Sequence, residues 1–237
     1  MKLLAIDTSA TAASVCLAEE NKIIGEFFNH TAITHSQTLM PMLDALLRQT
    51  GTSPDELSAI AVNAGPGSFT GVRIGVAAVK GLAFAHGIPC VSVSTLESMA
   101  YNMLGSDCIV SAVMDARCSQ VYNALFRVSG NTVERLCADR ALALSDLQAV
   151  LRDMDKPVVL VGDGAEISYR FLAESLPQVT AAPINRRLQT ASSTALAAFQ
   201  KLSSCETMTA AELMPVYLRL PQAQRELNQR LAKQSKE

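Results

Sequence analysis

Four short loops in this sequence combine residue types that can bind a phosphate or a cation. Residues 7–9 read Asp-Thr-Ser, residues 115–117 read Asp-Ala-Arg, and residues 63–73 and 162–164 are rich in glycine. A carboxylate can hold a cation, hydroxyls can bind phosphate oxygens, and the N–H groups of a glycine-rich loop can surround an anion. These loops indicate a nucleotide site, whose candidate residues are Asp7, Thr8, Ser9, Gly65, Gly67, Gly162 and Gly164.

The longest of these loops, residues 63–73, holds three glycines and a proline between an apolar run and a helical pattern. It is not a P-loop, because the Lys-Ser/Thr pair of that motif is missing and Arg73 does not replace it by spacing. A plainer interpretation stays open for every loop. Residues 7–9 and 162–164 suit ordinary turns, and the glycines of the long loop can simply let a helix pack closely on a sheet.

No set of catalytic or metal-ligating residues can be assembled from the sequence. The three histidines, His30, His35 and His86, form no ligand pair, and no Ser/His/Asp or Cys/His combination is evident. The six cysteines include no CxxC pair and mostly lie in apolar segments, as free buried thiols do. Cys118, in a loop-like segment, is the candidate for a reactive thiol. We therefore predict no catalytic residue and no metal site.

Composition limits the class of protein further. The chain has 237 residues, of which 49% are hydrophobic, so it can bury a substantial core. The formal net charge of −2 argues against binding nucleic acid alone through a broad basic face. No apolar run reaches the roughly 18 residues of a membrane span, and the N-terminus reaches a charge too soon for a signal peptide. We expect a cytoplasmic protein without a membrane segment.

The order of elements predicts a duplicated α/β fold. The expected strands are residues 3–6, 13–18, 22–28, 59–62, 90–93, 108–114, 121–128, 132–138 and 157–161, and the expected helices are 36–49, 72–86, 95–104, 145–154, 165–176 and 192–202. Each half reads as three strands followed by alternating helices and strands, which favours two mixed sheets with flanking helices and a cleft between them. We predict domains at 1–105 and 106–221, the last helices of the second packing back on the first, and a polar tail at 222–237.

Two helices carry more apolar residues than one buried stripe requires, namely residues 36–49 and 72–86. They are predicted to contact a partner, or a second copy of the chain when the partner is absent. The candidate contact residues are Leu39, Met40, Leu43, Leu47, Arg73 and Val76. The alternative is that both helices belong entirely to the core.

Five motifs together resemble a known family. They are Ile6-Asp-Thr-Ser9, His35-Ser-Gln37, residues 64–75, Met114-Asp-Ala-Arg117 and Pro215-Val-Tyr-Leu-Arg219. Along with the element order, they resemble the ribonuclease H-like ASKHA superfamily of actin-like ATPases, and within it the TsaB (YeaZ) family. The motifs are spread over nearly the whole chain.

The resemblance implies an accessory subunit that helps to make threonylcarbamoyladenosine at position 37 of tRNA. The implied partners are the catalytic paralogue TsaD, bound as a heterodimer, and the ATPase TsaE, with tRNA reached only through the complex. A homodimer is implied for the isolated chain. The resemblance implies no cofactor for the chain alone and places ATP or ADP at the partner interface.

The chain departs from the catalytic paralogue at two places. Val93 and Glu97 stand where that paralogue has a metal-binding His-x-x-x-His pair, and valine cannot ligate a metal. Residues 115–119 replace its Ser-Gly-Gly-His-Thr phosphate loop and add side chains where a phosphate would approach the backbone. Both departures argue that the nucleotide residues are vestigial. The alternatives are an independent ATP-binding enzyme, either an ATPase or a kinase, and a peptidase, which rests on the historical glycoprotease label of this group.

Overall fold

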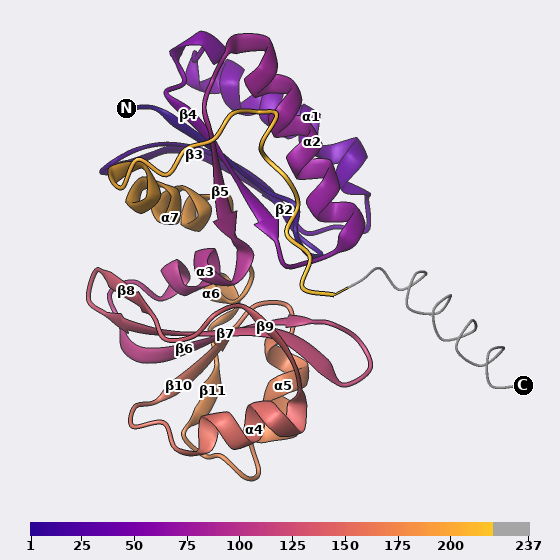
Figure 1. Ribbon diagram of the computed structural model, residues 1–237, viewed down its shortest axis with the longest axis vertical. Helices are drawn as coiled ribbons and strands as arrows, with labels where there is room; N and C mark the ends of the chain where they lie inside the picture. Colours follow the sequence, from indigo (N-terminus) through magenta and orange to yellow (C-terminus); the bar gives the residue numbers. More distant parts are fainter. Residues whose placement is uncertain (220–237) are drawn as a thin grey trace, which may run out of the picture.

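A computed structural model describes residues 1–219, which form two β-sheets with helices on both faces of each (Figure 1). The first sheet holds β1 (Leu3–Asp7), β2 (Ala13–Glu19), β3 (Lys22–Asn29), β4 (Ala59–Gly65) and β5 (Cys90–Ser94) in the order β3-β2-β1-β4-β5. β1, β2 and β3 are antiparallel neighbours, whereas β4 and β5 continue the sheet parallel to β1. Three meandering strands followed by αβ units therefore form one mixed sheet.

Alternation along β1 places helices on both faces of the first sheet. Leu4 and Ile6 pack with α1 (His35–Thr50) and α2 (Phe69–His86), whereas Leu3 and Ala5 pack with α7 (Ala191–Ser203). α1 ends at Gly51, whose φ of 61° is the left-handed conformation typical of a helix C-terminus. Ser68 caps the start of α2, and its hydroxyl accepts a hydrogen bond from the N–H of Gly71.

The second sheet holds β6 (Asp107–Asp115), β7 (Gln120–Ser129), β8 (Thr132–Arg135), β10 (Val158–Val161) and β11 (Val179–Ala181), and β9 (Arg140–Ala143) pairs with β7. Ile109 and Val113 of β6 pack with α4 (Leu144–Arg152) and α5 (Ala165–Leu172). Val110 and Ala112 face α3 (Thr95–Ala100) on the other side. α6 (Ile184–Arg187) lies near α3 in Figure 1.

The predicted class, two mixed sheets with flanking helices, is confirmed. Three short elements were not predicted, namely β9, β11 and α6, since segments of three or four residues have too little periodicity to detect. The strand predicted to reach Ala138 stops at Arg135, and the chain then returns through β9 to pair with the other half of β7. The helix predicted over 95–104 becomes a 3₁₀ turn after Ala100.

The domain boundaries stay predictions. α3 contacts the core of the second sheet, and α7, from late in the chain, contacts β1 and β2 of the first. The predicted polar tail, 222–237, lies outside the described residues. Within residues 1–219, no helix combines the length and the apolar character needed to cross a bilayer.

Candidate functional site

A cleft of about 440 Å³ lies where the loops of the two sheets meet. Its walls are residues 9–11, 66–70, 114–117 and 216–219, together with Tyr122 and Asp163. This volume is enough for a small ligand. Of the seven predicted nucleotide residues, Ser9 and Gly67 line the cleft, whereas Asp7, Thr8, Gly65, Gly162 and Gly164 are not among its walls.

Asp7 points into the protein rather than into the cleft. Its side chain is fully buried, and one carboxylate oxygen accepts hydrogen bonds of 2.7 Å from both the N–H and the hydroxyl of Ser9. The other oxygen accepts a hydrogen bond from the side-chain amide of Asn63. Burial raises the pKa of Asp7, and these hydrogen bonds oppose that effect. A carboxylate satisfied in this way serves the fold and is not available to a ligand in the cleft.

The glycines of the long loop bring backbone against backbone. A Cβ at Gly67 would lie 2.3 Å from the carbonyl oxygen of Ser9, and a Cβ at Gly71 would lie 2.2 Å from that of Thr8. The N–H of Ser68 already donates to the Ser9 carbonyl at 2.7 Å. Thr8 in turn donates its hydroxyl to the carbonyl of Gly71. These contacts hold the start of α2 on the end of β1, which supports the packing interpretation of the loop.

The remaining candidate glycines also face protein backbone. Gly65 has a φ of 127°, and a Cβ there would lie 2.2 Å from the carbonyl oxygen of Val216. Gly162 has a φ of 123°, and its Cβ would lie 2.0 Å from the carbonyl oxygen of Val113. Both positions require glycine because the left-handed backbone and the close approach exclude a side chain. The space beside each of these two glycines is therefore filled by the chain itself.

Two carboxylates, Asp115 and Asp163, and two arginines, Arg117 and Arg219, give the cleft its charges. Asp163 accepts a hydrogen bond of 3.4 Å from the N–H of Asp115. Burial raises the pKa of Asp163 to about 6, and the nearby charge of Asp115 adds to the increase. Arg219 donates to the carbonyl of Ala116 at 3.2 Å from the opposite wall. The site thus carries both signs of charge.

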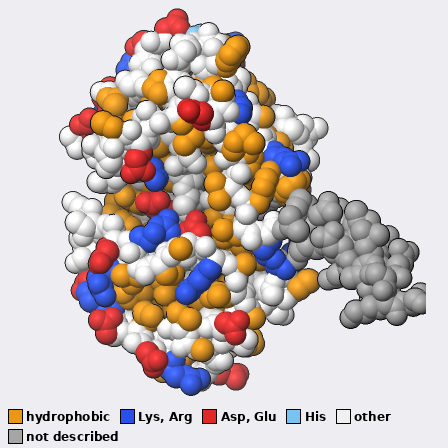
Figure 2. Space-filling view, viewed as in Figure 1, with side chains coloured by type: hydrophobic (Ala, Val, Ile, Leu, Met, Phe, Trp, Pro, Cys, Tyr) orange, Lys and Arg blue, Asp and Glu red, His pale blue; other side chains and the backbone are white. Residues whose placement is uncertain are grey.

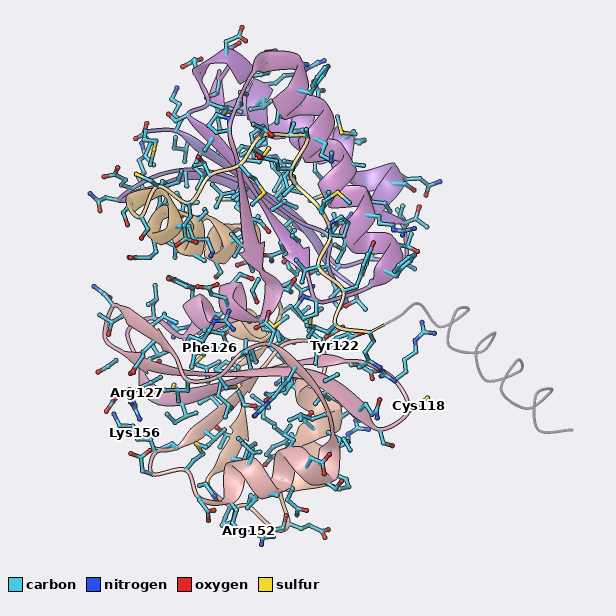
Figure 3. All side chains as sticks on the ribbon, in the orientation of Figure 1. Cys118, Tyr122, Phe126, Arg127, Arg152 and Lys156 are labelled. Carbon is cyan, nitrogen blue, oxygen red and sulfur yellow. The ribbon has the colours of Figure 1, made fainter. Side chains whose placement is uncertain are left out.

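The loop between β6 and β7 has an unusual backbone. Arg117, Cys118 and Ser119 have φ values of 63°, 54° and 54°, three consecutive left-handed residues without a glycine among them. Cys118 is exposed on this loop (Figure 3). The prediction of a reactive thiol at Cys118 stays a prediction. Cys205 is exposed as well, which the apolar context of most cysteines did not indicate.

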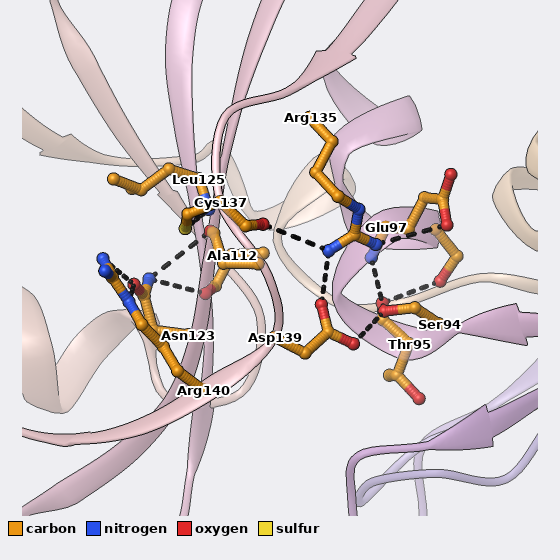
Figure 4. Close-up of polar contacts among 12 residues, drawn as sticks. Ser94, Thr95, Glu97, Ala112, Asn123, Leu125, Arg135, Cys137, Asp139 and Arg140 are labelled. Carbon is orange, nitrogen blue, oxygen red and sulfur yellow. Dashed lines mark hydrogen bonds and ion pairs between the residues drawn. The ribbon is translucent and has the colours of Figure 1, made fainter. Parts of the chain in front are cut away.

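Val93 and Glu97, the positions at which the resemblance implies metal ligands in the paralogue, have other contacts in this structure. Val93 is buried in β5, and Glu97 pairs with Arg135 at 3.2 Å. Arg135 also pairs with Asp139 at 2.5 Å, and the hydroxyl of Ser94 donates to Asp139 (Figure 4). An arginine thus supplies the positive charge beside Glu97. Among residues 1–219, no three His, Cys, Asp or Glu side chains are grouped to hold a metal ion.

His35 and His86 contact different parts of the chain. Nε2 of His35, on α1, lies 2.7 Å from the carbonyl oxygen of Ala10. Nδ1 of His86 lies 2.6 Å from the carboxylate of Asp55. Neither contact pairs a histidine with a serine or cysteine nucleophile, so the described geometry gives no support to the peptidase alternative.

Half of the predicted contact residues are internal, which corrects that prediction. Leu39, Leu43 and Val76 are 1%, 3% and 3% exposed and pack between the helices and the first sheet, so they cannot meet a partner directly. Leu47 is half-buried, whereas Met40 and Arg73 are exposed. Core and contact stripes both consist of apolar residues at helical spacing, so the sequence alone did not separate them.

The exposed face of α2 contains residues that the prediction missed. Phe84 is 84% exposed, and the neighbouring Ala77, Gly81 and Ala85 are exposed as well. A Cβ at Gly81 would meet nothing within 4 Å, so packing within the described chain does not require glycine there. The four-residue spacing of Ala77, Gly81 and Ala85 could have indicated this contact face from the sequence, because small side chains let another helix approach closely.

The two mixed sheets with their flanking helices define this chain as a member of the ASKHA class. Ethanolamine utilization protein EutJ from Carboxydothermus hydrogenoformans shares the fold with a TM-score of 0.52 at 13% identity, over 83% of this chain and 90% of that one. YeaZ from Pseudomonas aeruginosa superposes with a TM-score of 0.78 at 30% identity, over 92% of this chain and 99% of that one.

Sequence comparison identifies the family. The family described as TsaD, tRNA N6-adenosine threonylcarbamoyltransferase, matches residues 24–227. The tRNA threonylcarbamoyladenosine biosynthesis protein TsaB of Bacillus subtilis is 36% identical over 176 residues, 74% of this chain and 77% of that protein. TsaB of Escherichia coli is 38% identical over 136 residues, 56% of this chain and 58% of that protein. The chain belongs to the TsaB family.

Proposed function

We propose that this protein is an accessory subunit in the biosynthesis of threonylcarbamoyladenosine in tRNA, acting by contact with a catalytic paralogue. Support comes from the TsaB relatives, whose names assign them to this pathway. The paralogue proposed as the partner is TsaD, with the ATPase TsaE joining the complex. The tRNA is reached through these partners.

A non-catalytic role agrees with the state of the cleft. The buried carboxylate of Asp7 is satisfied by Ser9 and Asn63, and backbone carbonyls fill the space beside the candidate glycines. Glu97 is paired with Arg135. These arrangements engage Asp7 and Glu97 in contacts within the chain. ATP or ADP is therefore proposed to bind at the interface with the partner and not to the isolated chain.

The observation that carries this proposal is the uncovered face of α2. Phe84 and the small residues Ala77 and Gly81 form an apolar strip on a helix that already buries its other face against the first sheet. An exposed phenylalanine beside small residues suits the close approach of another helix. Met40 and Arg73 are exposed too and remain proposed contact residues. The same face is proposed to form the homodimer when no partner is present.

The charges of the surface agree with an indirect role toward tRNA. Figure 2 shows Lys and Arg side chains interspersed with Asp and Glu on the visible face rather than gathered in one basic region. The whole chain has a formal net charge of −2. A protein that bound tRNA alone would need more phosphate-neutralising side chains on one surface.

Depletion and complementation in the native host tests the function. Depleting the protein is expected to lower the threonylcarbamoyladenosine content of tRNA, measured by mass spectrometry of digested nucleosides, and the parent gene restores it. Phe84→Asp is expected to restore much less, because it places a charge on the proposed contact face. Phe171→Asp on α5 is the matched control, since Phe171 is also exposed, at 47%.

Two results would contradict the proposal. An unchanged nucleoside content after depletion would remove the protein from the pathway. Equal restoration by Phe84→Asp and Phe171→Asp, at equal protein levels, would remove the contact from this face of α2.

A further inference from the structure

The segment after α7 returns along α2, and residues 216–219 reach the cleft (Figure 1). Leu213 is fully buried against the first sheet and its helices, and Lys80 of α2 donates to its carbonyl at 2.9 Å. Beyond Leu213, residues 214–219 have no helix or strand, and none of their side chains is buried. We call residues 214–219 the strap. Leu213 is thus an anchor, after which the strap depends on a few polar and ring contacts.

The strap is attached to β4 by a backbone hydrogen bond and to α2 by side-chain contacts. The N–H of Val216 donates to the carbonyl of Ala64 at 2.7 Å. The ring of Tyr217 lies 4.9 Å from that of Phe69, measured between centroids. Arg73 covers the other aromatic partner, with its guanidinium carbon 3.7 Å from the centroid of Phe69, and its Nε donates to the hydroxyl of Tyr217 at 2.7 Å. Arg73 therefore contacts both aromatic residues, Phe69 and Tyr217.

The end of the strap reaches the second sheet. Arg219 donates to the carbonyl of Ala116 at 3.2 Å, on the loop that follows β6. Residues 216–219 also form one wall of the cleft. Arg73 thus contacts Tyr217, and only Leu218 separates Tyr217 from Arg219, so a displacement of Tyr217 can reach the contact of Arg219 with the loop.

We infer that the strap is a releasable latch across the cleft, and that Arg73 on the outer face of α2 holds it closed. A segment with few buried apolar contacts opens at a lower free energy than the core around it. Removing Arg73 takes away its hydrogen bond to Tyr217 and its cation–π contacts with Phe69 and Tyr217, and leaves Tyr217 with the stack on Phe69 alone. The strap then leaves Ala64, and Arg219 leaves Ala116.

The position of Arg73 gives the latch a role in partner binding, a consequence that rests on the proposed function. A carboxylate that a partner brings to the α2 face can bind the Arg73 guanidinium in place of the Tyr217 hydroxyl. Docking on α2 would then open the cleft, one wall of which is formed by residues 216–219 of the strap. The latch itself is a property of the isolated chain.

Hydrogen exchange of the full chain without any partner tests the latch. We compare the parent protein with Arg73→Ala and with Arg170→Ala, a control arginine exposed on α5. Arg73→Ala is expected to speed exchange of the Val216 amide about tenfold, as loss of both contacts would. Exchange of the Ala116 and Gln120 amides, which close the loop after β6, is expected to rise as well. Arg170→Ala is expected to change neither.

A second variant separates the hydroxyl from the ring. Tyr217→Phe retains the stack on Phe69 and loses the acceptor for Arg73, so a smaller increase at Val216 is expected. Unchanged Val216 exchange in both variants would overturn the latch. Faster exchange at Val216 without any change at Ala116 and Gln120 would overturn the connection across the cleft. Neither result bears on partner binding, which these measurements do not involve.

Discussion

The carboxylate of Asp7 accepts a hydrogen bond from the side-chain amide of Asn63, and this contact joins the end of β1 to the neighbouring strand β4. Asn63 in turn donates to the hydroxyl of Ser98 on α3 at 2.9 Å. An aspartate at the start of a loop, in a position that suits a phosphate or metal site, is therefore the centre of a buried network between the first sheet and α3.

Asp7→Ala is expected to destabilise the fold without changing ligand binding. The change leaves the N–H and hydroxyl of Ser9 and the amide of Asn63 buried without their acceptor. The expected loss is about 3 kcal/mol of unfolding free energy, measured by urea denaturation. ATP binding to the parent, lost in Asp7→Ala with no change in stability, would instead support the independent-enzyme alternative.

Two glycines on the same helix are expected to respond oppositely to alanine. Gly71→Ala should lower the unfolding free energy by several kcal/mol, because its Cβ would lie 2.2 Å from the carbonyl of Thr8. Gly81→Ala should raise it by about 0.5–1 kcal/mol, because its Cβ meets nothing and alanine favours the helix. Thermal denaturation of both variants checks the pair, and equal effects would contradict the packing role of the loop.

Asp163→Asn is expected to stabilise the protein in a pH-dependent way. The pKa of Asp163 is raised to about 6 in the fold, above its ordinary 3.8, so the fold favours the protonated form. Stability from this group is present at low pH and is lost as the pH rises through about 6. The asparagine variant should therefore exceed the parent by about 2–3 kcal/mol at pH 7–8 and match it near pH 4. An equal difference at both pH values would contradict this account.

Arg135→Gln is expected to destabilise more than Arg127→Gln. Arg135 pairs with Glu97 and Asp139 and lies 4.7 Å from the ring centroid of Phe126, whereas Arg127 has one exposed partner, Glu134. The expected losses are about 1–2 kcal/mol and under about 0.5 kcal/mol. Urea denaturation at low and high salt measures both, and equal losses would show that the Arg135 cluster contributes no more than a surface pair.

The sequence predicted the parts of the fold that have clear periodicity. The stripe of Leu39, Leu43 and Leu46 indicated α1, and the apolar segments at residues 3–6 and 13–18 indicated β1 and β2. β9, with four residues, and β11, with three, gave no such signal and depend on pairing with β7 and β10. Short strands of this kind are specified by tertiary contacts rather than by local pattern.

The candidate site was less predictable, because the same residue types serve binding and packing. Gly67 could have approached a phosphate, but the carbonyl of Ser9 lies there. Asp7 could have faced the cleft, but Ser9 and Asn63 hold it inside. Only the folded geometry separates these cases, since no spacing rule states which way a buried carboxylate points.

The contact face shows the opposite difficulty. The predicted contact residues were mostly large apolar residues on α1 and α2, but three of them, Leu39, Leu43 and Val76, belong to the core. The strip of Ala77, Gly81 and Phe84 has fewer large apolar residues than the core stripe and was not predicted, but its residues are the exposed ones. For a helix that packs on a sheet, the residues opposite the core stripe are the ones available to a partner.

Binding of the purified chain to the purified catalytic paralogue is the most direct test of the central claim. The account predicts a one-to-one complex with the parent and with Phe171→Asp, and a dissociation constant raised at least about tenfold by Phe84→Asp, since a charge would be buried at the contact. Sedimentation and titration calorimetry measure both quantities. Absence of any complex with the parent chain, or equal affinity for all three proteins, would contradict the account.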